Sequence, residues 1–175
     1  MNMLFADIRG FTTLTERMGT QKAFAMLNEI LAAVEAPIEN EKGFVNQCQG
    51  DAIFALYPGE ADATLRCTIA MVKEIQTLNV RRKSRNEAEI RFGLGISSGP
   101  LMLGAIGGVH RLESNVVGDT VNLSAWTESL TKLFGSQFHL QTTPRNSLAN
   151  RRSLKSENLT AWWLWDGRWP LRCMN

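Results

Sequence analysis

Two different hydrophobic periods alternate along this chain, and each predicts its own kind of secondary structure. Short runs rich in apolar and β-branched residues predict strands at 2–8, 44–49, 52–57, 89–96, 101–106 and 137–141. Gly50-Asp51 separates the second run from the third, and Ser98-Gly99-Pro100 lies between the fourth and the fifth. The first of these turns predicts a β-hairpin with Asp51 at its tip.

Three longer segments place apolar residues at helical spacing, namely 20–42, 61–80 and 119–134. Pro37 is expected to kink or interrupt the first helix, and Gly43 is expected to end it. Asp119 is a favourable N-cap for the third helix. The stretch Arg81–Glu87 follows the second helix and is polar and basic, so we interpret it as a surface loop.

Strands and helices interleave in this order, and hairpins occur among them. That combination predicts an α+β fold, a ferredoxin-like α/β sandwich with helices packed over one face of a mostly antiparallel sheet. The length suits a single domain over residues 1–175. Because the first strand begins almost at once, we expect this domain to be part of a longer chain. The Trp-rich tail at about 160–175 is interpreted as packing against a core or a dimer seam, with a docking strand for a partner as the alternative.

The composition narrows the functional classes. Nineteen basic residues against 17 acidic ones leave a net charge of +2, so the concentrated basic surface of a nucleic-acid-binding protein is not indicated. Cys48, Cys67 and Cys173 are widely spaced, which favours a reducing compartment over a disulfide framework. No apolar run approaches the roughly 18 residues that span a bilayer. We therefore expect a cytoplasmic domain that makes no membrane contact.

The segment from Phe5 to Thr12 brings a strand, an acid and a glycine into close succession. An apolar strand runs into Asp7, and Gly10 follows before a helix-prone stretch. The strand is expected to deliver Asp7 to an edge of the sheet, and Gly10 lets backbone N–H groups turn towards a ligand at a helix start. Such a turn can hold phosphate oxygens beside a carboxylate-bound metal ion.

Asp51, at the tip of the predicted hairpin, supplies a second carboxylate. Two carboxylates on neighbouring strand ends can clamp two Mg²⁺ ions against a triphosphate. The same residues also have an ordinary structural interpretation, because Asp and Gly are frequent in tight turns. From spacing alone, a metal site and a plain turn both remain open.

Four segments together resemble the catalytic domain of class III adenylate and guanylate cyclases. Phe5-Ala6-Asp7-Ile8-Arg9-Gly10-Phe11-Thr12 is similar to the opening motif of that family, and Gly50-Asp51-Ala52-Ile53 to its second metal motif. Residues 92–99 are similar to its central strand and turn, and residues 117–123 to the start of its catalytic helix. The segments follow the family's order, with family-like spacing, over roughly the first 140 residues.

The resemblance implies a lyase of the adenylate cyclase type. Such an enzyme converts a nucleoside triphosphate into a 3′,5′-cyclic monophosphate and pyrophosphate for intracellular signalling. The family works as head-to-tail dimers with each active site between two subunits, so a head-to-tail homodimer is implied here. Asn122, on the helix that the partner subunit supplies, would act in the transition state.

The resemblance also assigns roles to the residues of the two acidic motifs. Asp7, Asp51 and the carbonyl of Ile8 would hold two Mg²⁺ or Mn²⁺ ions. The backbone N–H groups that would bind the β and γ phosphates belong to Gly10, Phe11 and Thr12.

Two positions that would read the purine depart from the usual family pattern. Gln47 stands where adenylate cyclases have Lys and guanylate cyclases typically have Glu, and Asn115 stands where the partner is usually Asp or Thr. An amide both donates and accepts hydrogen bonds, so this pair suits either adenine or guanine. We expect ATP as the substrate, with GTP as the alternative.

A third departure concerns the catalytic helix. The family carries Asn-x-x-x-Arg there, a spacing that puts both side chains on one face, but Trp126 occupies the Arg position here. An indole has one N–H donor and no charge, so it cannot neutralise the transition-state phosphate as a guanidinium does. The other cations considered for this task are Arg111 and Arg168, the latter in a weak match to a phosphate-binding turn at Asp166-Gly167-Arg168.

Two functional hypotheses follow. The first is a working cyclase that is slow or depends on a partner, which the two retained carboxylates Asp7 and Asp51 favour. The second is a cyclase-like module that binds nucleotide and metal or only dimerises, which Trp126 favours. The related diguanylate-forming enzymes are disfavoured, because Gly50-Asp51-Ala52 lacks their Gly-Gly-acid-Glu-Phe hairpin tip.

Overall fold

The computed structural model describes residues 1–108, 111–134, 138–141 and 164–165. The helices are α1 (Phe11–Met18), α2 (Thr20–Asn40), α3 (Ala61–Ser84) and α4 (Asp119–Phe134). The strands are β1 (Asn2–Ile8), β2 (Phe44–Gln49), β3 (Ala52–Tyr57), β4 (Phe92–Ser98), β5 (Met102–Gly108), β6 (Arg111–Val117), β7 (Phe138–Gln141) and β8 (Leu164–Trp165). Within these residues, no helix is long and apolar enough to cross a membrane.

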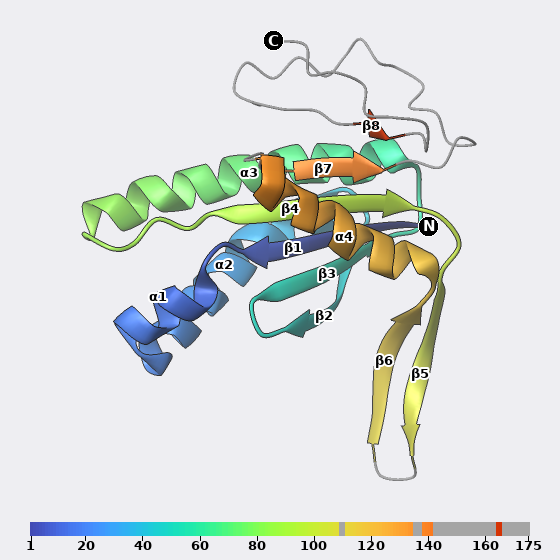
Figure 1. Ribbon diagram of the computed structural model, residues 1–175, viewed down its shortest axis with the longest axis horizontal. Helices are drawn as coiled ribbons and strands as arrows, with labels where there is room; N and C mark the ends of the chain where they lie inside the picture. The colour runs from blue at the N-terminus through green and yellow to red at the C-terminus, as the bar shows by residue number, and fades with distance from the viewer. Residues whose placement is uncertain (109–110, 135–137, 142–163, 166–175) are drawn as a thin grey trace.

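A six-stranded sheet forms the centre of the fold, and its strands lie in the order β2-β3-β1-β4-β7-β8. The first four strands pair antiparallel, and β7 and β8 join in parallel at the β4 edge. The predicted α+β fold with a mostly antiparallel sheet is therefore confirmed. Strands β5 and β6 form a separate two-stranded ribbon, which projects from the body as an arm (Figure 1).

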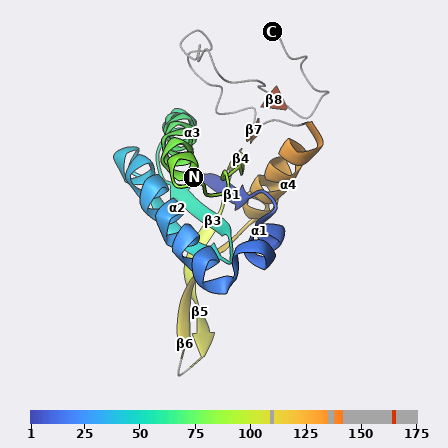
Figure 2. The same cartoon turned by 90° about the vertical axis from the view of Figure 1, so that its left-hand side faces the viewer.

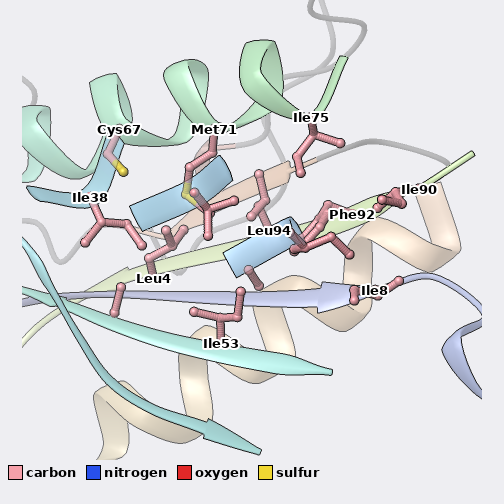
Figure 3. Close-up of a cluster of buried hydrophobic side chains, with 14 of the residues drawn as sticks. Leu4, Ile8, Ile38, Ile53, Cys67, Met71, Ile75, Ile90, Phe92 and Leu94 are labelled. Carbon is pink, nitrogen blue, oxygen red and sulfur yellow. The ribbon is translucent and has the colours of Figure 1, made fainter. Parts of the chain in front are cut away.

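The main hydrophobic core lies between the sheet and helices α2 and α3. Alternate residues of β1 point into it, as the period of a strand requires, and so do Phe92 and Leu94 of β4. Figure 3 shows these strand side chains facing Ile38 of α2 and Met71 and Ile75 of α3. This core covers the face of β1 that carries Leu4, Ala6 and Ile8.

Helix α4 covers the opposite face of the sheet, so the expectation that helices lie on one face is wrong. Figure 2 shows α2 and α3 on one side of the strands and α4 on the other. The reason is found in β4, where Gly93 and Gly95 alternate with the core residues and present no side chain to α4. The helix backbone therefore approaches so closely that a Cβ on Gly95 would lie 2.1 Å from the carbonyl oxygen of Ser124.

We expect the substitution Gly95→Ala to destabilise the domain by about 2–3 kcal/mol, because the added methyl group meets helix backbone that cannot rotate away. For a domain of this size that is a fall in the melting temperature of roughly 5–10 °C, measured by circular dichroism. Gly104→Ala in β5 is the matched control, since a Cβ there meets nothing within 4 Å. Equal melting temperatures for the two variants would contradict the close packing of α4 on β4.

The ends of two helices differ from the expected ones. Pro37 lies inside α2 and does not interrupt it. The helix ends at Asn40, and Lys42, two residues later, adopts the left-handed conformation with φ 59°. Gly43 is needed for another reason, because a Cβ there would be 2.3 Å from the Tyr57 ring. Helix α3 continues to Ser84, so the interpretation of Arg81–Glu87 as a loop is wrong over its first half.

Arg82 explains why α3 continues through this basic stretch. Its side chain is only 5% exposed and pairs with Glu29 of α2 at 2.7 Å, while it also donates to the carbonyl of Ala88. Strand β6 was not predicted at all. Within the part of the chain that the structure describes, it pairs only with β5, and its described side chains outside Asn115 and Val116 are exposed, so it shows little of the alternation that marks a half-buried strand.

Candidate active site

The end of β1 and the turn that follows it form one wall of the candidate site. Asp7 faces away from the main core and is half-buried, whereas the neighbouring side chain of Ile8 lies inside the core. Gly10 then takes a left-handed conformation, φ 67°, and becomes the N-cap of α1. Gly10 is needed here for its positive φ, since a Cβ would have open space. No side chain caps this helix start, so N–H groups of its first turn point outwards without a side-chain partner.

The hairpin between β2 and β3 forms the second wall. Gly50, at φ 61°, makes the tight turn, and β3 pairs with β1 so that Ile53 lies opposite Ala6. Asp51 is therefore brought beside Asp7. Burial raises the pKa of the Asp51 carboxyl, and Asp7 raises it further by charge repulsion and a hydrogen bond between the two side chains. A backbone hydrogen bond and the charge of Lys132 act in the opposite direction.

Three residues that the sequence interpretation missed extend this carboxylate pair. The ammonium group of Lys132, on the last turn of α4, lies 3.2 Å from Asp7 Oδ2. Glu128, one turn earlier, is 3.6 Å from the same nitrogen, and its other oxygen is 2.8 Å from the Arg9 guanidinium. Burial raises the pKa of Glu128, while Arg9 and Lys132 lower it. The result is a connected cluster of three carboxyl groups and two cations.

The packing of α4 could have revealed this cluster. Gly93 leaves the space in which Arg9 and Glu128 meet, because a Cβ there would be 2.1 Å from Glu128 Oε1 and 2.2 Å from an Arg9 nitrogen. Glu128 and Lys132 are also four residues apart on one helix, a spacing that puts them on the same face. These two signals mark the helix face that turns towards Asp7.

The residues present fit an open site for a hard divalent cation. Mg²⁺ is usually bound by one or two carboxylates together with substrate phosphates, and seldom by a complete protein cage. Asp7 and Asp51 provide two carboxylates side by side, and the Lys132 ammonium already occupies a position where positive charge is favourable. Among the described residues, no group of three or more His, Cys, Asp or Glu side chains is arranged to hold a metal by itself.

The two predicted purine-reading residues lie on different strands near the base of the arm. Gln47 is half-buried on β2, directly after a bulge in its pairing with β3. Asn115 is half-buried on β6, and its side-chain oxygen accepts a hydrogen bond from the N–H of Val116. The strands meet one residue earlier, where the Ser114 hydroxyl donates to Asn46 at 2.9 Å.

Asn122 and Trp126 are not brought to the carboxylate pair of their own chain. Both are exposed on the first half of α4, and the Trp126 side chain is 71% exposed. Lys132, which does contact Asp7, is ten residues beyond Asn122 on the same helix, or roughly 15 Å at 1.5 Å per residue, and six residues beyond Trp126, or roughly 9 Å. Figure 1 shows the first turn of α4 beside the base of the β5–β6 arm, far from the end of β1.

Several predicted features fall outside what the structure describes. Arg168 and the turn Asp166-Gly167-Arg168 lie outside the described residues, and so does most of the Trp-rich tail. Arg111 belongs to β6, but its side chain is not described.

Comparison with known sequences identifies similar proteins over most of the chain. A family model described as the adenylate and guanylate cyclase catalytic domain matches residues 1–159. An adenylate cyclase of Anabaena cylindrica is 36% identical over 140 residues, which cover 77% of this chain and 28% of that protein. A terminal-differentiation-specific adenylate cyclase of Dictyostelium discoideum is 30% identical over 142 residues, covering 78% of this chain and 7% of that protein. The chain thus spans only a minor part of the length of these relatives.

Solved structures are similar to the fold as well. A bacterial light-regulated adenylyl cyclase superposes with a TM-score of 0.74 at 26% identity, covering 81% of this chain and 42% of the other. The guanylyl cyclase Cya2 superposes with a TM-score of 0.67 at 28% identity, covering 74% and 68% of the two chains. The similar structures therefore include both an adenylyl cyclase and a guanylyl cyclase.

Proposed function

Since the chain belongs to the adenylate and guanylate cyclase catalytic domain family, we propose that it converts ATP into 3′,5′-cyclic AMP and pyrophosphate. The observation that carries the proposal is the side-by-side placement of Asp7 and Asp51 next to the uncapped start of α1. A hairpin turn with no function in binding would have no need to bring a second carboxylate against the first, where the two repel each other.

Asp7 and Asp51, with the carbonyl of Ile8, are the residues that would hold two Mg²⁺ or Mn²⁺ ions. When bound, such ions offset phosphate charge and lower the pKa of the attacking hydroxyl. The N–H groups of Gly10, Phe11 and Thr12 would bind the β and γ phosphates, because the start of a helix combines free donors with a positive dipole end. The chain thus holds the triphosphate at one place and orients its α phosphate.

The reaction itself is an in-line displacement at the α phosphorus. The ribose 3′-oxygen forms a bond to that phosphorus, its proton passes to water, and the bond to the β,γ-pyrophosphate breaks. Asn122 would hydrogen-bond the α phosphate as charge builds up on its oxygens. Because Asn122 lies about 15 Å along α4 from Lys132, which contacts Asp7 of the same chain, a second copy would have to supply it.

The exposed surface supports a homodimer that brings two such halves together head to tail. Apolar side chains are exposed along the β5–β6 arm, at Met102 (75%), Ile106 (53%) and Val117 (60%). Trp126 of α4, 71% exposed, adds a large aromatic ring. Large exposed apolar side chains gathered on a projecting ribbon favour burial against a partner, and a second copy of the same chain is the partner we propose.

We also propose that the domain lies in the cytoplasm and is part of a longer protein. Cys48 and Cys67 are both free thiols, which suits a reducing compartment. The relatives that this chain matches are several times longer, which supports the interpretation of residues 1–175 as one catalytic domain of a larger protein.

One observation favours a second candidate function, a cyclase-like module that binds nucleotide and metal without rapid turnover. Trp126 occupies the position of the family's transition-state arginine, and its indole carries no charge. A comparable arginine contributes roughly 10³–10⁵ to the rate of phosphoryl transfer. This candidate predicts that the domain binds Mn²⁺ and ATP but forms product only very slowly.

Incubation with ATP and with GTP in separate reactions, each with Mn²⁺ or Mg²⁺, tests the proposal. We expect cyclic AMP and pyrophosphate in equal amounts from ATP and less product from GTP, measured by liquid chromatography. Cyclic GMP as the main product would assign Gln47 and Asn115 to guanine. Binding of ATP with no cyclic product would favour the second candidate, and absence of both binding and product would reject the two.

A further inference from the structure

Lys132 lies between two carboxylates and contacts both. Its ammonium nitrogen is 3.2 Å from Asp7 Oδ2 on one side and 3.6 Å from Glu128 Oε2 on the other. The Lys132 side chain is 51% exposed, whereas that of Glu128 is 2% exposed and also pairs with Arg9 at 2.8 Å. The lysine is therefore free to change its position, while Glu128 is held in place.

The electrostatics of the cluster explain why a cation is needed at Asp7. Asp7 and Asp51 are like charges in direct interaction, and Asp51 is partly desolvated. The Lys132 ammonium neutralises one of them and stabilises the charged form of the pair. A divalent cation at the same carboxylates would do this more effectively, but it would repel an ammonium group a few ångströms away.

We propose that Lys132 is a tethered counter-ion of the Asp7–Asp51 pair, which competes with the first divalent cation for Asp7 and moves over to Glu128 when that cation binds. The inference rests on the proposed function, because it requires these carboxylates to bind divalent cations. Glu128 is a suitable second partner, since it is one helical turn away on the same face and already within 3.6 Å. Lys132 thereby sets the metal affinity of the site without being a metal ligand.

The substitution Lys132→Met tests this, because methionine keeps much of the aliphatic stem and removes the charge. With nucleotide-free protein and Mn²⁺ alone, we expect the Mn²⁺ dissociation constant to fall by roughly threefold to tenfold, as removal of a competing ion pair implies. Binding is measured by isothermal titration calorimetry. Lys73→Met, an exposed lysine of α3, removes the same charge elsewhere and should leave Mn²⁺ affinity unchanged.

Thermal stability provides a second readout, which separates a counter-ion from an ordinary salt bridge. Without metal, Lys132→Met should melt at a lower temperature than the wild type, because the two carboxylates lose their neutralising charge. With saturating Mn²⁺ the difference in melting temperature between the two proteins should become smaller, because Lys132 then keeps only its contact with Glu128, so the shift caused by Mn²⁺ grows in the variant. An ordinary salt bridge to Asp7 that persists in the loaded state would leave the difference in melting temperature unchanged by Mn²⁺ and would overturn the inference.

Further variants make the outcome decisive. Lys132→Arg keeps the charge and should keep Mn²⁺ affinity within about twofold of wild type. Lys132→Gln removes the charge and replaces the methionine variant if that one fails to fold. If the charge-removing variant binds Mn²⁺ no more tightly than wild type does, the inference is wrong while the proposed function stands. If wild type binds no more Mn²⁺ than Asp7→Asn does, both the inference and the metal site of the proposed function fail.

Discussion

Cyclic nucleotide formation is expected to fall at least about 10³-fold when Asp7 is replaced by alanine, because the site then loses one of the two carboxylates that hold charge-neutralising cations against the triphosphate. The loss should appear in kcat, with the melting temperature changed by only a few degrees. Asp7 lies at the end of β1, outside the main core, so its side chain supports no buried packing. Product is measured by chromatography after incubation with Mn²⁺ and ATP.

The matched control for this experiment is Asp62→Ala. Asp62 is also a partly exposed aspartate, but it lies in the first turn of α3, away from the candidate site. We expect that variant to keep activity within about twofold of wild type, since loss of a charge at a helix start costs only a fraction of a kcal/mol in most cases. Full activity in Asp7→Ala would reject the assignment of Asp7 to the catalytic metal site.

The acidic pair could be predicted from the sequence because each member is positioned by local structure. An apolar strand ends at Asp7, and a glycine turn between two strands carries Asp51. Neighbouring strands of one sheet then bring the two residues together, and the register of β1 with β3 does so here. These local patterns place each carboxylate at the end of a strand. That the two carboxylates act as a pair was implied by the resemblance to the cyclase family, because the pairing of β1 with β3 joins residues far apart in the sequence.

Lys132, Glu128 and Arg9 could not be predicted in the same way, because their meeting depends on which face of α4 packs against which strand. The prediction of helices on one face of the sheet concealed this contact. The useful signal was the alternation of Gly93 and Gly95 with core residues in β4, which marks a strand face open to close approach by a helix. The same non-local dependence explains β6, whose only strand partner among the described residues is β5.

Turnover should rise about tenfold or more when Trp126 is replaced by arginine, if the missing guanidinium limits the rate. The indole is 71% exposed on α4, and arginine is a better helix former than tryptophan, so the fold should tolerate the change. Because charge builds up on the phosphate only in the transition state, we expect the gain in kcat with little change in KM. Steady-state rates with Mn²⁺ and ATP measure both constants.

Two controls decide whether the position or the charge produces the gain. Ser129→Arg adds a guanidinium to another exposed position of α4 and should leave kcat unchanged. Trp126→Gln removes the indole without adding charge and should not raise kcat either. An unchanged kcat in a folded Trp126→Arg dimer would show that another cation already acts on the phosphate.

A mixing experiment then shows from which subunit the arginine acts. The double variant Asp7→Ala, Trp126→Arg should be inactive alone, because both of its sites lack Asp7. Mixed in excess with wild type, it should raise product formation per wild-type chain towards the level of Trp126→Arg, because each wild-type metal site then faces a helix that carries arginine. This expectation follows from the exposure of Trp126 and from the roughly 9 Å that six residues of α4 place between it and Lys132 in one chain. If the residue at position 126 instead served the site of its own chain, mixing would never raise the rate above that of wild type, and the head-to-tail arrangement would be wrong.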